Sequence, residues 1–152
     1  MDLCLSHENC IEEALLKAEM ICKDRGVRLT KLRREVLEVI WESHAPVKAY
    51  EILDKLHKHS SIPRPPTVYR SLDFLLENGL IHKLASYKAY IGCSHPLRHK
   101  DCYFLICNLC GEIAECCDHV ITKNIVMSAN KHCFNLGQIT LEIEGVCIQC
   151  KA

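Results

Sequence analysis

Cys107-Asn108-Leu109-Cys110 and Cys147-Ile148-Gln149-Cys150 are the two stretches around which this sequence is organised. A Cys-x-x-Cys pair places two thiolates on one tight turn, so two pairs supply the four soft ligands of a tetrahedral zinc ion. Gly111 follows the first pair, where a chain that turns around a metal often needs a positive φ. Residues 111–146 separate the pairs by more than the usual interval, but the entropic cost of closing a loop grows only logarithmically with its length. The sequence therefore predicts a closed structural zinc site in its last third.

The composition is that of a globular protein, with 49% apolar and 25% charged residues in a chain of 152. This length allows one domain or two small ones. No apolar stretch is long enough to cross a membrane, and Met1-Asp2-Leu3-Cys4 lacks the basic and apolar regions of a secretory signal. We therefore expect a cytoplasmic protein without a membrane partner. Its 12 cysteines then indicate metal or redox chemistry rather than a disulfide scaffold.

The formal net charge is zero, so the overall charge does not indicate a nucleic-acid partner. The local charge is more informative, because residues 25–34 contain five basic side chains and no acidic one. A solvated helix face explains such a run as well as a DNA contact does.

Apolar periodicity predicts three helices in the first third of the chain. The first covers residues 8–23 and ends before Gly26, the second is capped by Thr30, and the third covers residues 48–57. Arg64-Pro65-Pro66-Thr67 then leads into a fourth helix that ends at Asn78-Gly79. Arg70 lies on the face of this fourth helix that points away from the core.

A strand pair is expected next, at residues 80–84 and 89–93. Helices followed by a two-stranded wing form a winged helix-turn-helix, in which the helix from Pro66 is presented to the DNA major groove. An ordinary small α/β domain is the alternative interpretation.

The remaining residues predict a second, smaller domain. Residues 94–101 are polar and contain Pro96, which indicates a hinge. Strands are expected at 102–107, 112–116 and 139–143, with a helix at 120–131 capped by Asp118. So short a segment has too small a core to fold unaided and needs a metal, a partner or both. The predicted fold is α+β, with a winged-helix domain at 1–93, a hinge at 94–101 and a small α/β domain at 102–152.

Four stretches, together with the two cysteine pairs, resemble the ferric uptake regulator family and most of all its zinc-sensing branch. They are Val27-Arg28-Leu29-Thr30, Ala49-Tyr50-Glu51-Ile52-Leu53, Pro65-Pro66-Thr67-Val68-Tyr69-Arg70-Ser71-Leu72-Asp73-Phe74-Leu75 and Gly79-Leu80-Ile81-His82-Lys83. The resemblance covers about residues 8–150. It implies a homodimeric, zinc-dependent repressor of zinc uptake genes that binds a double-stranded DNA operator, with 102–152 as the dimerisation domain. It implies neither enzymatic activity nor a small organic substrate.

The resemblance also implies two zinc ions per chain. The structural ion takes Cys107, Cys110, Cys147 and Cys150, as their spacing already predicts. The regulatory ion takes His82, Cys93, a hinge histidine and Glu115. His99 matches the hinge position better than His95 does. A thiolate ligand favours zinc over iron at such a site, and an ion held by both domains would fix the angle between them.

The DNA-binding residues follow from the same resemblance and from side-chain chemistry. Arg70 can pair with a purine edge, and Tyr50 occupies a position that touches bases in the family. Tyr69 lies at the edge of the buried face and suits either the core or a phosphate contact. The predicted interface comprises Tyr50, Thr67, Tyr69 and Arg70, with Arg28, Lys31, Arg33 and Arg64 as phosphate contacts.

Three alternatives predict different functions. An iron or peroxide sensor of the same family would not use Cys93 as a ligand. A thiol oxidoreductase or zinc hydrolase would need redox-active thiols or an open zinc position. A zinc-stapled interaction module would not bind duplex DNA. Two further clusters have no assigned role: Cys4, His7 and Cys10, and Cys116, Cys117 and His119.

Overall fold

The computed structural model describes residues 7–58 and 63–151. The chain divides into two compact units, Met1–Ser94 and His95–Ala152, and the division falls inside the segment expected to be the hinge. Cys4, with which the unassigned N-terminal cluster begins, lies outside the described residues, as does the side chain of His7.

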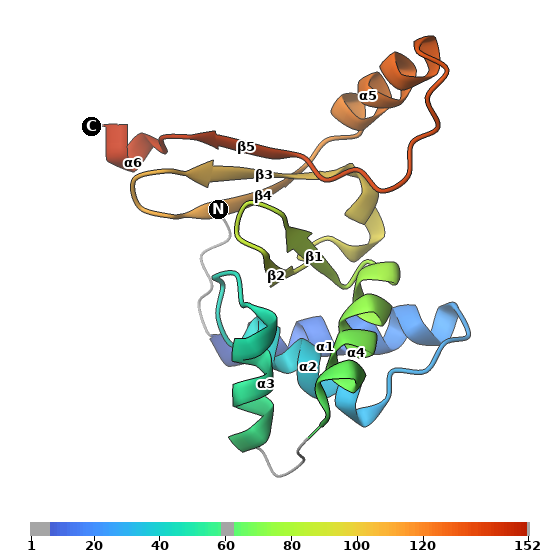
Figure 1. Ribbon diagram of the computed structural model, residues 1–152, viewed down its shortest axis with the longest axis vertical. Coiled ribbons are helices and arrows are strands. Elements are labelled where there is room, and N and C mark those ends of the chain that lie inside the picture. The colour runs from blue at the N-terminus through green and yellow to red at the C-terminus, as the bar shows by residue number, and fades with distance from the viewer. Residues whose placement is uncertain (1–6, 59–62, 152) are drawn as a thin grey trace. The chain divides into compact units, whose positions relative to one another are not determined.

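Four helices form most of the first unit (Figure 1): α1 (His7–Asp24), α2 (Lys31–Trp41), α3 (Ala49–Lys58) and α4 (Pro65–Glu77). Each begins within two residues of its predicted start, and α1, α3 and α4 also end within two residues of their predicted ends. Gly26 follows α1 with a φ of 66°. Thr30 caps α2, since its Oγ1 accepts a hydrogen bond of 3.4 Å from the backbone N–H of Arg33.

The wing consists of β1 (Ile81–Leu84) and β2 (Ala89–Gly92), which pair antiparallel with Ile81 opposite Gly92. Val47, between α2 and α3, adds a short bridge to the wing through two backbone hydrogen bonds of 2.8 Å with Tyr90. Helices followed by this two-stranded wing confirm the predicted winged helix-turn-helix.

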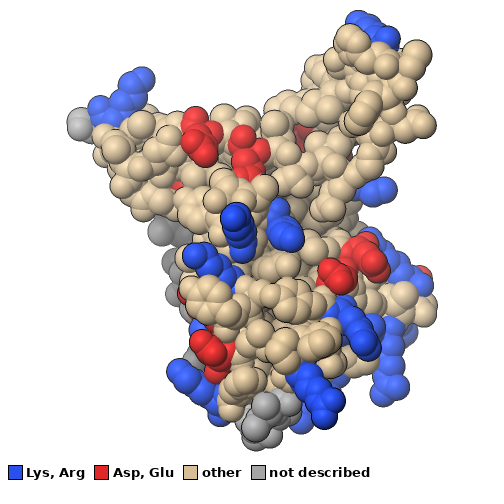
Figure 2. All heavy atoms as spheres, viewed as in Figure 1, with Lys and Arg blue, Asp and Glu red and all other residues tan. Residues whose placement is uncertain are grey.

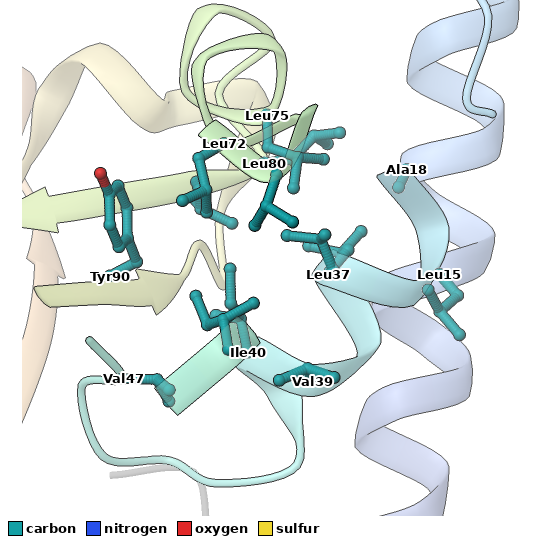
Figure 3. Close-up of a cluster of buried hydrophobic side chains, with 14 of the residues drawn as sticks. Leu15, Ala18, Leu37, Val39, Ile40, Val47, Leu72, Leu75, Leu80 and Tyr90 are labelled. Carbon is teal, nitrogen blue, oxygen red and sulfur yellow. The ribbon is translucent and has the colours of Figure 1, made fainter. Parts of the chain in front are cut away.

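The core of the first unit is continuous (Figure 3). Side chains from α1, α2, α4 and both wing strands meet there, and several are fully buried. Each fully buried Leu or Ile contributes about 1.5–3 kcal/mol relative to an exposed one. The apolar core therefore holds α4 against the other helices, with the buried residues Val36, Leu37, Ile40, Ile52, Leu56, Val68, Leu72, Leu75 and Ile81 at its centre.

The second unit contains a three-stranded sheet in the order β4-β3-β5 (Figure 1). β3 (Cys102–Cys107) pairs antiparallel with β4 (Ile113–Cys117) and parallel with β5 (Glu142–Gly145). The remaining elements are the 3₁₀ helix η1 (Pro96–Asp101), α5 (His119–Lys131) and the short α6 (Ile148–Lys151). Asp118 caps α5 as predicted, its Oδ1 accepting a hydrogen bond of 2.8 Å from the backbone N–H of Val120.

Three details differ from the prediction. The last strand was expected at 139–143 but lies at 142–145, because its parallel pairing places Cys107 opposite Gly145. No helix was predicted within the expected hinge, but residues 96–101 form η1. Within the described part of the chain, one disulfide joins Cys102 and Cys117, which face each other across β3 and β4, where none was expected.

The second unit leaves much of its apolar surface exposed. No residue of α5, which is described in full, is buried, and Val120 and Met127 are 62% and 49% exposed. Leu105 of β3 and Ile143 of β5 are each 42% exposed. Among the helices that the structure describes, none is both long enough and apolar enough to cross a membrane.

Candidate metal centre and nucleic-acid interface

The four cysteines of the two Cys-x-x-Cys pairs come together in the second unit. The Sγ atoms of Cys107, Cys110, Cys147 and Cys150 all lie within 4.8 Å of one another. A tetrahedron with zinc–sulfur bonds of about 2.3 Å has edges of about 3.8 Å. The Sγ atoms of Cys110 and Cys147 are 3.8 Å apart, which fits such an edge. The donor set and its spacing therefore suit a closed four-thiolate metal site.

Backbone geometry holds these sulfurs in place. Cys107 ends β3, and the turn after it closes through a hydrogen bond of 2.9 Å from the N–H of Gly111 to the carbonyl of Cys107. Gly111 has a φ of 74°, which glycine adopts at little cost. The parallel register of β5 brings the second pair alongside, so that the N–H of Cys147 donates to the Cys107 Sγ at 3.3 Å.

Two of the four cysteines, Cys107 and Cys150, have pKa values shifted in opposite directions. Hydrogen bonds from the backbone N–H groups of Cys147, Cys110 and Leu109 lower the pKa of Cys107 to about 6. Hydrogen bonds with the side chains of Cys147 and Cys110 raise the pKa of Cys150 to about 12. Cys107 therefore loses its proton more readily than Cys150, and a divalent cation would favour the thiolate form of all four.

Of the second predicted ligand set, His82 and Cys93 lie on the wing. His82 is in β1 opposite Ile91, and Cys93 directly follows β2, where its N–H donates to the carbonyl of Leu80 at 3.0 Å. Their ligand atoms lie within 4.8 Å of each other, and both residues are less than 10% exposed. A histidine and a cysteine held side by side on paired strands can supply two ligands to a metal ion.

The other two predicted ligands belong to the second unit. His99 lies on η1 and is half-buried, whereas the rival His95 precedes η1 and is exposed. Glu115 lies on β4 opposite Phe104 and is half-buried.

Two members of the unassigned cluster near Glu115, Cys117 and His119, have partners in the structure. Cys117 forms the disulfide with Cys102, and the Cys117 carbonyl accepts a hydrogen bond of 2.8 Å from Arg98. His119 lies 3.4 Å from the carboxylate of Asp101. These contacts connect η1 to the end of β4 and to the start of α5, and the sequence predicted none of them, because they depend on the strand register.

Helix α4 presents the predicted reading residues to solvent. Val68, Leu72 and Leu75 are fully buried, while Thr67 and Arg70 are exposed and Tyr69 is 48% exposed. Tyr50, at the start of α3, is 59% exposed, and the Lys48 ammonium lies 6.0 Å from its ring centroid. Exposed arginine and tyrosine side chains on such a helix suit base and phosphate contacts.

The predicted phosphate contacts have different surroundings. Lys31 is 88% exposed, with its ammonium 3.8 Å from Glu35, and Arg28 and Arg64 are exposed. Arg33 is half-buried, because its guanidinium lies over the ring of Phe74. Figure 2 shows basic side chains standing apart on the visible face, with acidic ones between some of them, rather than merging into one patch.

Two further contacts position the wing and α4. Arg25 donates a hydrogen bond of 2.7 Å to the carbonyl of Asn78, the residue that ends α4. A Cβ atom added at Gly92 would lie 2.3 Å from the ring of Trp41, so β2 passes directly against the end of α2. Gly92 inside a predicted strand was the one local signal of such a close approach.

Comparison with known proteins adds to this geometry. A model of the ferric uptake regulator family matches residues 24–144. The zinc uptake regulation protein of Escherichia coli (strain K12) is 39% identical over 142 residues, which cover 91% of this chain and 82% of that protein.

Two solved structures have the same fold. The crystal structure of holo XcZur matches with a TM-score of 0.83 at 39% identity, covering 90% of this chain and 96% of that one. A zinc uptake regulator complexed with zinc and DNA also matches with a TM-score of 0.83, at 37% identity, covering 93% and 95%. The winged helix, the paired cysteines and these matches together show that the chain belongs to the ferric uptake regulator family.

Proposed function

We propose that this protein is a zinc-responsive, dimeric, sequence-specific DNA-binding repressor that controls zinc uptake genes. The observation that carries the proposal is the match over 93% of the chain to a zinc uptake regulator complexed with zinc and DNA. The exposed face of α4 and the four clustered thiols supply the chemistry that such a protein needs. Its action belongs in the cytoplasm, where operator DNA is found.

The first zinc ion is structural and is held by Cys107, Cys110, Cys147 and Cys150. Four thiolates close the coordination sphere, so no position remains for a substrate, as a catalytic zinc would require. The role of this ion is to staple β3 to the segment after β5. We assign no enzymatic activity to the chain, in keeping with relatives that are transcription regulators.

The second zinc ion is regulatory, and its ligands are His82, Cys93, His99 and Glu115. Two of these residues belong to the winged-helix unit and two to the second unit. An ion that took all four would fix one unit with respect to the other. In a dimer it would therefore set the separation of the two α4 helices, which must match the spacing of the DNA half-sites.

The protein exchanges between an arrangement of its units that binds DNA and others that do not. Zinc shifts this equilibrium only because it binds the DNA-binding arrangement more tightly. The metal must also displace protons from Cys93 and from the histidines before it binds. Repression should accordingly weaken as the pH falls, because protons then compete with the metal for these ligands.

The homodimer is supported by the surface of the second unit. A unit this small buries little of its own apolar surface, and Val120, Met127, Leu105 and Ile143 are all at least 42% exposed. An exposed apolar surface of this kind marks a protein interface. We propose that a second copy of the chain covers it.

The DNA contacts divide into reading and positioning residues. Arg70 and Tyr50 contact bases, while Thr67 and Tyr69 approach the DNA backbone. Arg28, Lys31 and Arg64 contact phosphates, so replacing any of them weakens binding to all sequences about equally. The sequence alone also predicted Arg33 to be a phosphate contact.

The test is DNA binding measured by fluorescence anisotropy while free zinc is set by a metal buffer. Wild-type protein should bind its operator tightly only above a threshold of free zinc. Cys93→Ser should lose this response while still holding one zinc ion per chain, and Cys133→Ser, an exposed cysteine outside both sets, should behave as wild type. Operator binding of equal strength after chelation of the regulatory zinc would refute the proposal.

An iron or peroxide sensor remains the second candidate, because proteins of both kinds are also similar to this chain. Cys93 distinguishes the candidates, since a buried thiolate beside His82 favours zinc over iron. If iron activated DNA binding at lower free concentrations than zinc, the second candidate would replace the first.

A further inference from the structure

Arg33 has a more constrained environment than the other basic residues near the DNA-reading helix. Its guanidinium carbon lies 3.6 Å from the centroid of the Phe74 ring, so the flat group stacks on the ring face. Its Nη1 donates a hydrogen bond of 2.6 Å to the carbonyl of Arg28. Stacking and hydrogen bonding together fix both the plane and the direction of the side chain.

These two contacts join three parts of the first unit. Arg33 belongs to the first turn of α2, Arg28 to the segment between α1 and α2, and Phe74 to α4. The same turn of α2 receives the Thr30 cap through the backbone N–H of Arg33. A single side chain thus fastens the start of α2 and the preceding segment to the reading helix.

Phe74 has a specific place on α4. It follows Arg70 by four residues, so the two side chains share one face of the helix in consecutive turns. Phe74 is half-buried and packs on the edge of the core, while Arg70 is exposed. A displacement of the Phe74 ring would therefore shift the neighbouring turn of α4, which carries Arg70, the residue proposed to contact a base.

We propose that Arg33 is a positioning residue and not a phosphate contact. By stacking on Phe74 it fixes the position of α4 and so the orientation of Arg70 toward the DNA. This inference rests on the proposed DNA-binding function. It predicts that the shape and donors of arginine matter at position 33, whereas a phosphate contact needs only a positive charge. It also predicts that loss of Arg33 reduces preference for the operator more than it reduces affinity for DNA in general.

The probe is a duplex selected from a randomised pool by zinc-loaded wild-type protein, compared with the unselected pool. The variants are Arg33→Gln, Arg33→Lys, Phe74→Leu and the double change Arg33→Gln with Phe74→Leu. Lys31→Ala is the matched control, because Lys31 lies two residues away and is 88% exposed. Affinities for both duplexes are measured at several salt concentrations, with zinc content and circular dichroism to verify folding.

We expect Arg33→Gln to bind the selected duplex about tenfold more weakly, from the loss of one cation–π contact and one hydrogen bond. Binding to the unselected pool and the dependence of affinity on salt should stay near wild type. Arg33→Lys should not restore the preference, and the double change should cost little more than either single change. Lys31→Ala should weaken both duplexes and reduce the salt slope by about 0.9.

Full rescue by Arg33→Lys, or a salt slope reduced as in Lys31→Ala, would overturn the inference and make Arg33 a phosphate contact. A lower melting temperature with an unchanged ratio of selected to unselected affinity would also overturn it, since that result describes a purely structural role. If Arg33→Gln does not fold, Phe74→Leu and Arg33→Lys carry the same test. Failure of the wild-type protein to select any duplex would instead refute the proposed function itself.

Discussion

The two units of this chain are stabilised in different ways. The first unit has a continuous apolar core to which α1, α2, α3, α4 and the wing all contribute (Figure 3). The second unit buries Cys102, Phe104, Ile106 and Cys107 of β3, while its helix α5 has no buried residue. Apolar burial therefore accounts for the first fold and not for the second.

Instead of a large core, the second unit has a cluster of thiols and an exposed apolar surface. Four thiols converge where β3 ends and α6 begins, and exposed apolar side chains lie on α5 and the sheet. The metal ion and the second copy of the chain proposed above would supply the stabilisation that small domains otherwise lack. If so, loss of the metal at the four thiols should destabilise the second unit and leave the apolar core of the first unit intact.

Removing one thiol of the four-cysteine cluster should have the largest effect on stability, and it should destabilise the second unit but not the first. In Cys110→Ser a hydroxyl replaces a thiolate, and the binding free energy of a structural zinc ion, about 10–16 kcal/mol in small zinc peptides, is largely lost. We expect one fewer zinc ion per chain and rapid hydrogen exchange in β3 and β5. Exchange in α2 and α4 should remain slow.

Cys133→Ser is the control for this change, since Cys133 is exposed and lies outside both predicted ligand sets. It should retain the wild-type zinc content and exchange pattern. Slow exchange in β3 of a zinc-depleted Cys110→Ser protein would show that the metal does not hold the second unit together.

A core truncation should produce the opposite pattern. Leu72 of α4 is fully buried, so Leu72→Ala should cost about 2–5 kcal/mol in the free energy of unfolding of the first unit. Zinc content should not change. Leu16→Ala on α1 is the matched control, because Leu16 is 60% exposed and its truncation should cost about 0.5 kcal/mol or less. Denaturant unfolding, followed by circular dichroism, measures both costs.

The contact between the wing and α2 offers a smaller change with its own spectroscopic signal. Gly92→Ala would place a Cβ atom 2.3 Å from the ring of Trp41, and such overpacking should cost about 1–3 kcal/mol. Trp41 is the one tryptophan of the sequence, so its emission should report the displacement directly. Gly137→Ala is the control, since a Cβ atom there has no neighbour within 4 Å. Unchanged emission in Gly92→Ala would show that the wing does not press on α2.

Local patterns in the sequence predicted most of the first unit and the cysteine site. Helix bounds, the Thr30 cap and the buried face of α4 depend on residues a few positions apart. The spacing within each Cys-x-x-Cys pair is also a local pattern, and it predicts a metal site. Such features follow from the sequence because neighbouring residues determine them.

The remaining features depend on contacts between distant residues. Alternation around 139–143 indicates a strand, but only pairing with β3 places it at 142–145. The Cys102–Cys117 disulfide follows from the register of β3 and β4, and the stacking of Arg33 on Phe74 from the packing of α2 against α4. His82 and Glu115 carry no local signal at all, so only the family resemblance could suggest them as ligands.

The smallest expected effect comes from removing one helix cap in each unit. Thr30→Ala removes the cap of α2 and Asp118→Ala removes that of α5, and each loss typically costs about 1 kcal/mol of helix stability. Because α2 contributes Val36, Leu37 and Ile40 to the core, the first loss should lower the free energy of global unfolding. Since α5 has no buried residue, the second should accelerate hydrogen exchange in residues 119–131 and leave global unfolding almost unchanged. Equal losses of global stability in the two variants would mean that α5 is as firmly integrated as α2, and the contrast between the units would then not extend to their helices.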